Sequence, residues 1–281
     1  MPPDYDTREQ QMLLTAARLG YLSVVKKIVQ ENPEIAIDYS VPSASAYPPI
    51  YQAIVNGKSS VVKFFLERGA DPFRENPGGA TRRITNTYAF AMSSSNQKIK
   101  EMFLQMNPPQ ESLDYGLSLA IQNDDVKTAE RLVSKGGQCK RSIEEYLAAR
   151  DNPRTLKFLI DQGLDVNKQG EVYTPLMQAS LKDERYDSAK LTRLLLDAGA
   201  KMDLQNEEGN TALHYASRSG NVVVIEMLLK RGAKRLKNHL GKTPSDWIGL
   251  ESPRFRINPS EAKKERDRRK IEALFQQYGS H

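Results

Sequence analysis

The chain has 281 residues, of which 39% are hydrophobic and only 7% aromatic, and its net charge at pH 7 is +6. We expect no membrane partner, because no stretch approaches the roughly 18 unbroken apolar residues of a membrane span. The first residues predict no secretory signal, and the single cysteine, Cys139, can form neither an internal disulfide nor a cysteine-rich metal site. A cytoplasmic and/or nuclear location is therefore expected.

The positive charge is concentrated at one end of the chain. From Lys230 onward there are 14 basic and 6 acidic residues, a net charge of +8, so residues 1–229 together carry −2.

A spacing pattern recurs along the chain and predicts a tandem repeat. An alanine stands thirteen positions before an apolar residue in five places: Ala16 and Val29, Ala53 and Leu66, Ala91 and Leu104, Ala120 and Val133, Ala216 and Leu229. Gly or Asn then marks seven ends with a mean period near 33: Asn32, Gly69, Asn107, Gly136, Gly163, Gly199 and Gly232. Because Gly and Asn tolerate the left-handed conformation, we expect a helix to end at each of them.

Two helices are predicted within each repeat. Apolar residues spaced three and four apart, as over Val61–Leu66 and Val222–Leu229, favour one apolar face on the second helix. The first helix is expected to begin at Thr174-Pro175, Thr211-Ala212 and Thr243-Pro244, because Thr accepts a hydrogen bond from a free amide and Pro suits the next position.

The segment Gly209–Ala216, followed by Gly220-Asn221, Leu228-Leu229 and Gly232-Ala233, resembles an ankyrin repeat in which Ala212 replaces the usual proline. Thr174-Pro175-Leu176, with Leu195-Leu196 and Gly199-Ala200, makes a second unit of this kind, and Tyr47–Asp71 makes a third. The resemblance covers nearly the whole chain and implies an all-α solenoid of stacked helix-turn-helix units with finger loops, about eight units including degenerate ends. A single array over residues 1–281 is expected, with approximate units 8–40, 41–76, 77–110, 111–138, 139–168, 169–204, 205–236 and 237–281, the last a C-terminal cap with a basic insertion.

Two irregularities interrupt the pattern. About four extra residues follow Ala179, within Leu181–Asp187, if the thirteen-residue spacing is the reference. In the last unit the second helix is delayed by Gly249–Ser260. Insertions in repeat arrays map to loops, often on a binding face.

Catalytic and metal sites are not predicted. The three histidines, His214, His239 and His281, lack the spacing of metal ligands on a helix turn, and Asn76–Ala80 is a turn-rich loop without the Lys-Ser/Thr of a phosphate loop. We interpret His214 as a structural residue that ties its helix start to adjacent loops, and Cys139 as a passive thiol. No catalytic residue, metal or cofactor is expected, so an enzyme built from loop insertions ranks last among the functions considered.

The resemblance implies a concave binding surface formed by finger loops and first helices. Its candidate partner-binding residues are Tyr47, Tyr51, Arg82, Arg83, Tyr88, Tyr173, Met177, Gln178, Tyr186, Asn206, Glu208, Tyr215 and Arg218. Tyr and Arg are over-represented among residues that dominate interfaces. The alternative is that some of these tyrosines pack between repeats, and Trp247 is expected to pack in the terminal cap. We expect a monomeric, non-catalytic adaptor or scaffold that binds another protein.

A candidate basic patch lies near the C-terminus and comprises Lys263, Lys264, Arg266, Arg268, Arg269 and Lys270. Because Ile271, Leu274 and Phe275 follow, we predict a last helix with an exposed first part and a packed second part. A solvated capping helix, a site for an acidic partner and a nuclear-import signal are the alternatives. A nuclear or nucleic-acid-associated factor is the second functional hypothesis, although no nucleic-acid-binding motif accompanies the charge, so nucleic acid is not the expected partner.

Overall fold

The structure is a computed structural model that describes residues 7–38, 48–76, 85–139, 142–143, 146–147, 151–181, 187–248 and 261–278, with only the backbone described at 75–76, 85 and 261–264. The chain divides into two compact units, residues 1–140 and 141–281. That both belong to one array with the repeat boundaries given above stays a prediction.

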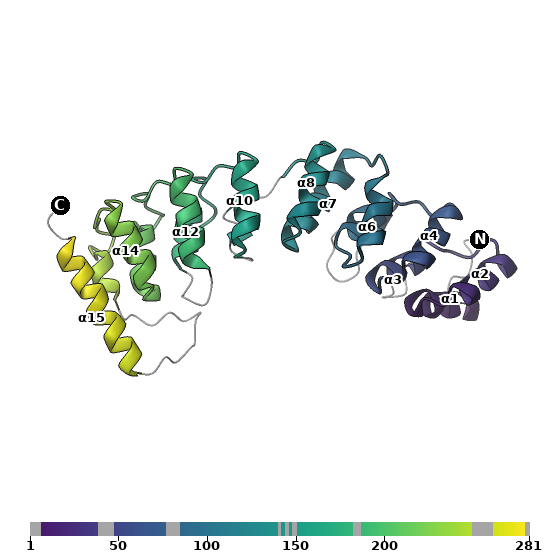
Figure 1. Ribbon diagram of the computed structural model, residues 1–281, viewed down its shortest axis with the longest axis horizontal. Helices are drawn as coiled ribbons and strands as arrows, with labels where there is room; N and C mark the ends of the chain where they lie inside the picture. The colour runs from purple at the N-terminus through teal and green to yellow at the C-terminus, as the bar shows by residue number, and fades with distance from the viewer. Residues whose placement is uncertain are drawn as a thin grey trace. The chain divides into compact units, whose positions relative to one another are not determined.

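The first unit consists of helix pairs (Figure 1) and one short antiparallel pair of strands. Its elements are α1 (Arg8–Leu19), α2 (Leu22–Glu31), α3 (Pro49–Val55), α4 (Ser59–Glu67), β1 (Glu75–Asn76), β2 (Thr85–Asn86), α5 (Thr87–Met92), α6 (Gln97–Leu104), α7 (Gln110–Gln122) and α8 (Val126–Ser134). The second unit has α10 (Pro153–Asp161), α11 (Pro175–Ser180), α12 (Ser188–Asp197), α13 (Ala212–Ser219), α14 (Val222–Lys230), the 3-10 helix η1 (Pro244–Trp247) and α15 (Glu261–Gln277).

Two rows of contacts stack the helix pairs. The first helices of successive pairs touch one another, as α1 does α3, α3 does α5 and α5 does α7 in the first unit, and as α11 does α13 and α13 does η1 in the second. The second helices form a parallel row, α2 to α4 to α6 and α10 to α12 to α14. Each pair therefore buries its apolar face against its neighbours, as in a helical solenoid.

The all-α expectation is confirmed, with one small addition. β1 and β2 pair antiparallel, with Glu75 opposite Asn86 and Asn76 opposite Thr85. The Asn86 side chain then caps α5 by accepting a hydrogen bond from the Ala89 amide at 2.8 Å. A two-residue ladder in a finger loop is too short to leave a strand pattern in the sequence.

The predicted helix ends are confirmed at the glycines and at Asn32, but the asparagines do not adopt the left-handed conformation. Gly69, Gly136, Gly163, Gly199 and Gly232 all have positive φ, between +78° and +96°. Asn32 has φ −132° instead, and its side-chain amide donates to the Ile28 carbonyl at 2.9 Å. Asn107 is also absent from the positive-φ residues. Asparagine ends α2 by hydrogen bonding, which releases it from the left-handed conformation.

The three predicted threonine caps are confirmed. Thr174, Thr211 and Thr243 stand immediately before α11, α13 and η1. The Thr174 hydroxyl accepts a hydrogen bond from the Met177 amide at 3.3 Å. The longer connection predicted after Ala179 is also present, since α11 ends at Ser180 and α12 begins only at Ser188.

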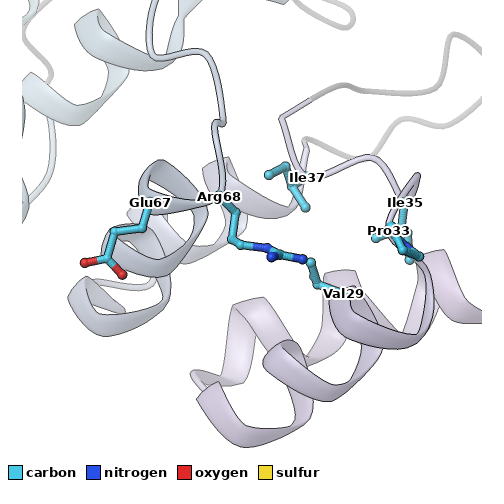
Figure 2. A pocket seen from close by; sticks show the side chains of 6 residues that line it. All are labelled: Val29, Pro33, Ile35, Ile37, Glu67 and Arg68. Carbon is cyan, nitrogen blue, oxygen red and sulfur yellow. The ribbon is translucent and has the colours of Figure 1, made fainter.

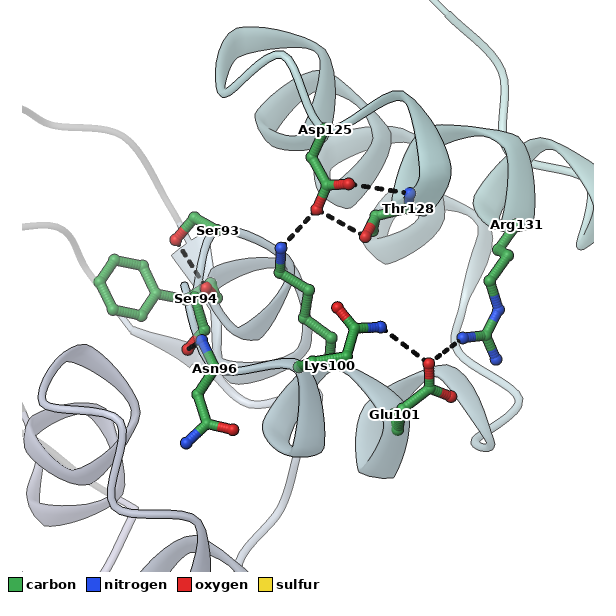
Figure 3. A network of polar contacts seen from close by, with 10 residues as sticks. Ser93, Ser94, Asn96, Lys100, Glu101, Asp125, Thr128 and Arg131 are labelled. Carbon is green, nitrogen blue, oxygen red and sulfur yellow. Dashed lines mark hydrogen bonds and ion pairs between the residues drawn. The ribbon is translucent and has the colours of Figure 1, made fainter.

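A polar network joins α6 to α8, the second helices of neighbouring repeats (Figure 3). The Lys100 ammonium donates to the Asp125 carboxylate, and Arg131 donates to Glu101. Asp125 also accepts from the Thr128 amide at 3.1 Å and the Thr128 hydroxyl at 2.7 Å, so it caps α8 as well. Lys100 is buried, and its pairing supplies the compensation that a buried charge requires.

The last helix, α15, packs on α14. Ile271 and Phe275 are buried there, and the Arg235 guanidinium lies 5.2 Å from the centre of the Phe275 ring. This confirms the predicted packing of its later turns.

Within the described ranges, no helix combines the length and the apolar content that crossing a bilayer requires.

Candidate protein-binding surface

The second unit presents a finger loop whose shape is fixed by Asn206. The side-chain oxygen of this buried residue accepts hydrogen bonds from the amides of Glu208 and Asn210, at 3.2 and 2.9 Å. Its side-chain nitrogen donates to the Val172 carbonyl at 3.2 Å and to the Tyr215 hydroxyl at 3.0 Å. One side chain thus joins two successive finger loops to the first helix of the repeat.

The next finger loop stacks closely on this one. The His239 amide donates to the Glu208 carbonyl at 3.0 Å, and the Asn238 side chain donates to that of Asn210 at 2.8 Å. The close approach leaves no room for a side chain at the tip of the first loop, where a Cβ on Gly209 would lie 2.7 Å from the His239 nitrogen. The two loops are therefore held as one rigid layer.

An aromatic cluster lies beside these loops. Tyr173 and Tyr215 meet edge to face with ring centres 5.2 Å apart, and Tyr215 meets Trp247 in the same way at 5.8 Å. The Arg218 guanidinium lies 5.6 Å from the centre of the Trp247 ring. Tyr173, Arg218 and Trp247 are half-buried, whereas Tyr215 is buried between them. We call these four residues the aromatic cluster.

His214 is a structural residue, as predicted, and its ring lies against Trp247 of the aromatic cluster. Its Nε2 lies 3.1 Å from the Lys242 carbonyl oxygen, which can only accept, so Nε2 carries the proton. Its Nδ1 then accepts from the Thr211 amide at 3.1 Å, and the ring meets Trp247 at 5.5 Å. Burial lowers the pKa of His214, while the bond to Lys242 and the charge of Asp246 act in the opposite direction. The imidazole is thus a structural tie between two repeats.

The position of a residue after its helix cap decides whether it is exposed. In α3, α5, α11 and α13 the residues two and three positions after the cap point into the stack, because there those positions face the neighbouring helices. The buried residues there are Ile50 and Tyr51 in α3, Tyr88 and Ala89 in α5, Leu176 and Met177 in α11, and Leu213 and His214 in α13.

This rule corrects part of the predicted surface. Tyr51, Tyr88 and Met177 are fully buried, and Asn206 and Tyr215 nearly so, which makes direct contact with a partner impossible without rearrangement. Their side chains pack between repeats, the alternative considered from the sequence. Burial raises the pKa of Tyr88 to about 12.

In α3, α5, α11 and η1 the position four after the cap is half-buried and holds Gln52, Phe90, Gln178 and Trp247. In α13 the same position holds the buried Tyr215. Phe90 stacks on the buried Tyr51 with ring centres 4.7 Å apart. Neither Phe90 nor Trp247 is among the predicted binding residues, although alignment of the caps alone places both in the same column as Tyr215.

Other predicted residues have different positions. Tyr173, Gln178 and Arg218 are half-buried and Glu208 is exposed, so these four remain accessible candidates in the second unit. Tyr47, Arg82, Arg83 and Tyr186 lie outside the described residues, as do the side chains of Lys263 and Lys264.

The described part of the basic patch is largely paired with carboxylates of its own helix. Arg268 pairs with Glu272 and Arg269 with Glu265, both at 2.9 Å, and Arg266 lies 3.7 Å from Asp267. Lys270 is exposed. Such exposed pairs contribute little to stability but reduce the net charge that a partner meets.

Among the residues that the structure describes, no three His, Cys, Asp or Glu side chains gather in a way that could hold a metal ion. The surface is instead one of rings, amides and a guanidinium on a rigid support, which is chemistry suited to recognition.

Comparison with known proteins agrees with this geometry. A family model described as ankyrin repeats (3 copies) matches residues 145–239, the part of the chain that includes α10 to α14. This part of the chain is made of ankyrin repeats. Ankyrin repeats generally mediate protein–protein interaction.

Two relatives match this chain over part of their own length. A putative palmitoyltransferase, ZDHHC13, of Danio rerio is 26% identical over 236 residues, which are 80% of this chain and 35% of that protein. The putative ankyrin repeat protein FPV031 of Fowlpox virus (strain NVSL) is 37% identical over 94 residues, 32% of this chain and 26% of that protein. This chain thus spans well under two thirds of either relative. The crystal structure of the human ASB11 ankyrin repeat domain matches with a TM-score of 0.49 at 18% identity, covering 93% of this chain and 96% of that one.

Proposed function

We propose that this chain is a non-catalytic, intracellular adaptor or scaffold that binds a partner protein through its finger loops and first helices, the surface that the family resemblance predicts to be concave. The observation that carries the proposal is the aromatic cluster of the second unit, in which Tyr173, Trp247 and Arg218 remain accessible around a buried Tyr215.

The cluster has the properties of an interface anchor. Its rings are already held edge to face, so a partner that packs on them loses little side-chain entropy. Arg218 is positioned over Trp247 by a cation–π contact, which leaves the guanidinium ordered for hydrogen bonding. Tyr, Trp and Arg are the residues most enriched among those that carry binding energy.

The support beneath the cluster is also rigid. Asn206 binds the Tyr215 hydroxyl, and the stacked finger loops share backbone hydrogen bonds. Burial raises the pKa of the Tyr215 phenol, against the effect of hydrogen bonds from Asn210 and Asn206, so the hydroxyl stays neutral. A binding surface on such a preorganised support needs no ordering step before contact.

Quantitative affinity capture from cell extract tests the proposal. The cluster variant is Tyr173→Ala with Arg218→Glu, and the control variant is Arg193→Glu with Val223→Ala, which makes the same charge change and one truncation to alanine at exposed residues of α12 and α14. We expect a partner whose recovery falls at least about tenfold with the cluster variant, the effect of losing an interface hot spot, and is unchanged with the control.

Two measurements make the outcome decisive. Circular dichroism must show that both variants retain the helix content of the parent chain. Equal recovery of every captured protein by the cluster variant and the parent would then reject this surface. A monomer is expected at all stages, and light scattering after gel filtration measures it.

The second candidate, a nuclear or nucleic-acid-associated factor acting through the basic end, has weaker support. Three of the four described cations of the basic patch have carboxylates of α15 beside them. Binding through phosphate contacts weakens steeply with salt because counterions are released. A salt-sensitive shift of DNA or RNA by the parent chain, lost when Lys270 and its neighbours are reversed in charge, would favour this alternative over the first.

A further inference from the structure

The last finger loop of the second unit, residues 234–243, lies in a strongly basic stretch between α14 and η1. Residues 230–248 include six basic residues and one acidic residue, a net charge of +5: Lys230, Arg231, Lys234, Arg235, Lys237 and Lys242 against Asp246. Whether this charge is available to a partner depends on which of the six side chains are already paired.

Three of the six have partners elsewhere in the fold. Lys230 and Arg231 form ion pairs with carboxylates of α14 and α12, both at 2.6 Å. The Arg235 guanidinium donates to the Phe275 carbonyl of α15 and lies over the ring of the same residue. These three cations therefore hold helices together.

The other three, Lys234, Lys237 and Lys242, are exposed, and within the part of the chain that the structure describes they have no ion pair or side-chain hydrogen bond. The Asp246 carboxylate instead accepts hydrogen bonds from the Thr243 amide and hydroxyl, at 2.7 and 2.8 Å. These bonds lower the pKa of Asp246 most, and the charge of Lys242 adds to the effect without forming an ion pair. The unpaired charge of the basic end thus lies in the finger loop, whereas three arginines of α15 are paired.

The loop presents these charges around an apolar tip. The Asn238 amide donates to the Lys242 carbonyl at 2.9 Å, and the Asn238 side-chain oxygen accepts from the amides of Leu240 and Lys242, at 3.0 and 2.9 Å. Leu240 stands at the tip of this turn with its side chain 82% exposed. Lys237 and Lys242 flank the turn, so a partner that reaches Leu240 also meets their ammonium groups.

The finger loop stacked beside this one has the opposite charge. Glu207 and Glu208 are exposed near its tip. The Glu208 carboxylate accepts from Asn210 at 2.7 Å, and among the described residues neither glutamate forms an ion pair with a lysine of the last loop. A nucleic-acid strand carries a negative charge at every phosphate, so it would be repelled where it crosses the acidic loop. A polypeptide can confine its carboxylates to the basic loop.

We infer that the loop at residues 234–243 binds an acidic segment of a partner polypeptide, whose carboxylates meet Lys234, Lys237 and Lys242 and whose apolar side chain packs on Leu240. Charge complementarity and the exposed leucine together select this occupant. The inference rests on the proposed function, because the loop belongs to the proposed finger-loop surface, and it specifies the chemistry of the partner.

The probe is the peptide acetyl-Asp-Glu-Leu-Glu-Asp-amide, which places four carboxylates around one leucine. It is titrated into the full isotope-labelled chain, and two-dimensional NMR of the backbone amides measures the affinity and locates the site. We expect the largest shifts in residues 234–243. The affinity should be at least about threefold weaker at 150 mM than at 20 mM salt, because salt screens exposed charges.

Four comparisons test the assigned chemistry. The peptide with Asn and Gln in place of its acids should bind at least about fivefold more weakly. Lys237→Gln with Lys242→Gln should cause a similar loss, because each exposed ion pair contributes a factor of up to about five. The control Lys98→Gln with Lys127→Gln, which removes two exposed lysines of α6 and α8, should leave the affinity unchanged. Leu240→Ser should weaken binding at least about twofold through the lost apolar contact.

The fourth comparison separates polypeptide from nucleic acid. Single-stranded pentathymidylate has four phosphodiester charges, the same number as the peptide, and should bind this loop more weakly. Tighter binding of pentathymidylate than of the peptide would overturn the polypeptide assignment. Equal affinity for the acidic and neutral peptides, an unchanged affinity after the Lys237 and Lys242 substitutions, or main shifts outside residues 234–243 would reject the loop as an acidic-segment site. Because the titration requires no natural partner, failure of affinity capture at the aromatic cluster would not alter its result.

Discussion

The ion pair between Lys100 and Asp125 is predicted to contribute strongly to stability. The variant Asp125→Asn removes the negative charge and keeps the shape of the side chain. The side chains are only 10% and 22% exposed, so neither charge is well solvated when the other is removed. Asparagine keeps the oxygen that caps α8, and what is lost is the partner of a buried ammonium. Breaking a fully buried ion pair costs about 3–5 kcal/mol, and because Asp125 retains some exposure we expect about 2 kcal/mol here.

The reverse variant, Lys100→Met, is expected to cost less. Asp125 then keeps its hydrogen bonds from the Thr128 amide and hydroxyl, and methionine fills the space of the lysine stem, so we expect about 1 kcal/mol. The double variant should cost little more than Lys100→Met alone. The summed costs of the two single variants then exceed the cost of the double variant by a coupling energy of about 2 kcal/mol, which is well above the additivity error for independent sites.

Urea unfolding followed by far-ultraviolet circular dichroism measures these free energies, and hydrogen exchange of the α6 and α8 amides shows where protection is lost. The matched control is Asp161→Asn, which breaks the Lys157–Asp161 pair of α10, where the side chains are 62% and 53% exposed. That control should cost under about 0.5 kcal/mol. Additive costs in the double variant, or an equal cost for the control, would refute the reasoning from burial.

Three further predictions concern the second unit. Stability should fall as pH drops from about 6.5 toward the lowered pKa of His214, because the unfolded chain binds a proton that the buried imidazole resists; His214→Gln should flatten this part of the pH–stability profile, and an unchanged slope would assign it to other groups. Gly209→Ala should cost at least about 2 kcal/mol, because φ is +77° and a Cβ would lie 2.7 Å from the His239 nitrogen. At Gly220, where φ is +69° and nothing lies within 4 Å, alanine should cost about 1 kcal/mol, and equal thermal shifts would contradict the steric argument. Leu240→Ser should change stability by under about 0.5 kcal/mol, because the side chain is 82% exposed; a larger loss on urea unfolding would show that the loop tip packs.

The sequence predicted the repeat geometry well wherever a local rule determines it. Glycine stops and threonine caps depend on the backbone of one or two residues. Those rules hold at the five predicted glycines from Gly69 to Gly232 and at Thr174, Thr211 and Thr243. At Asn32 the helix ends as predicted but the backbone is not left-handed, because asparagine can also satisfy a helix end through its own side chain.

The binding surface was harder to predict, because exposure depends on neighbours that are distant in sequence. Tyr173 and Tyr215 are both tyrosines near a helix start, yet only Tyr215 is enclosed, since Trp247 of the next repeat covers its other side. A cavity of about 300 Å³ in the first unit depends in the same way on a loop from one repeat and a helix end from the next (Figure 2). It is lined by Val29, Pro33, Ile35, Ile37, Glu67 and Arg68. Neither arrangement has a signature within a single repeat.

The residues four positions after the caps of α3, α5, α11, α13 and η1 form a column in which four side chains are half-buried and one is buried. Gln52, Phe90, Gln178, Tyr215 and Trp247 differ in size and polarity, while in the four α-helices the residues immediately before them stay inside the stack. Substitution at the half-buried members of this column would therefore change the exposed surface while the residues before them keep the stack, whereas Tyr215 is buried and belongs to the stack itself. A protein built in this way can acquire new specificity through single substitutions, each repeat varying independently of the others.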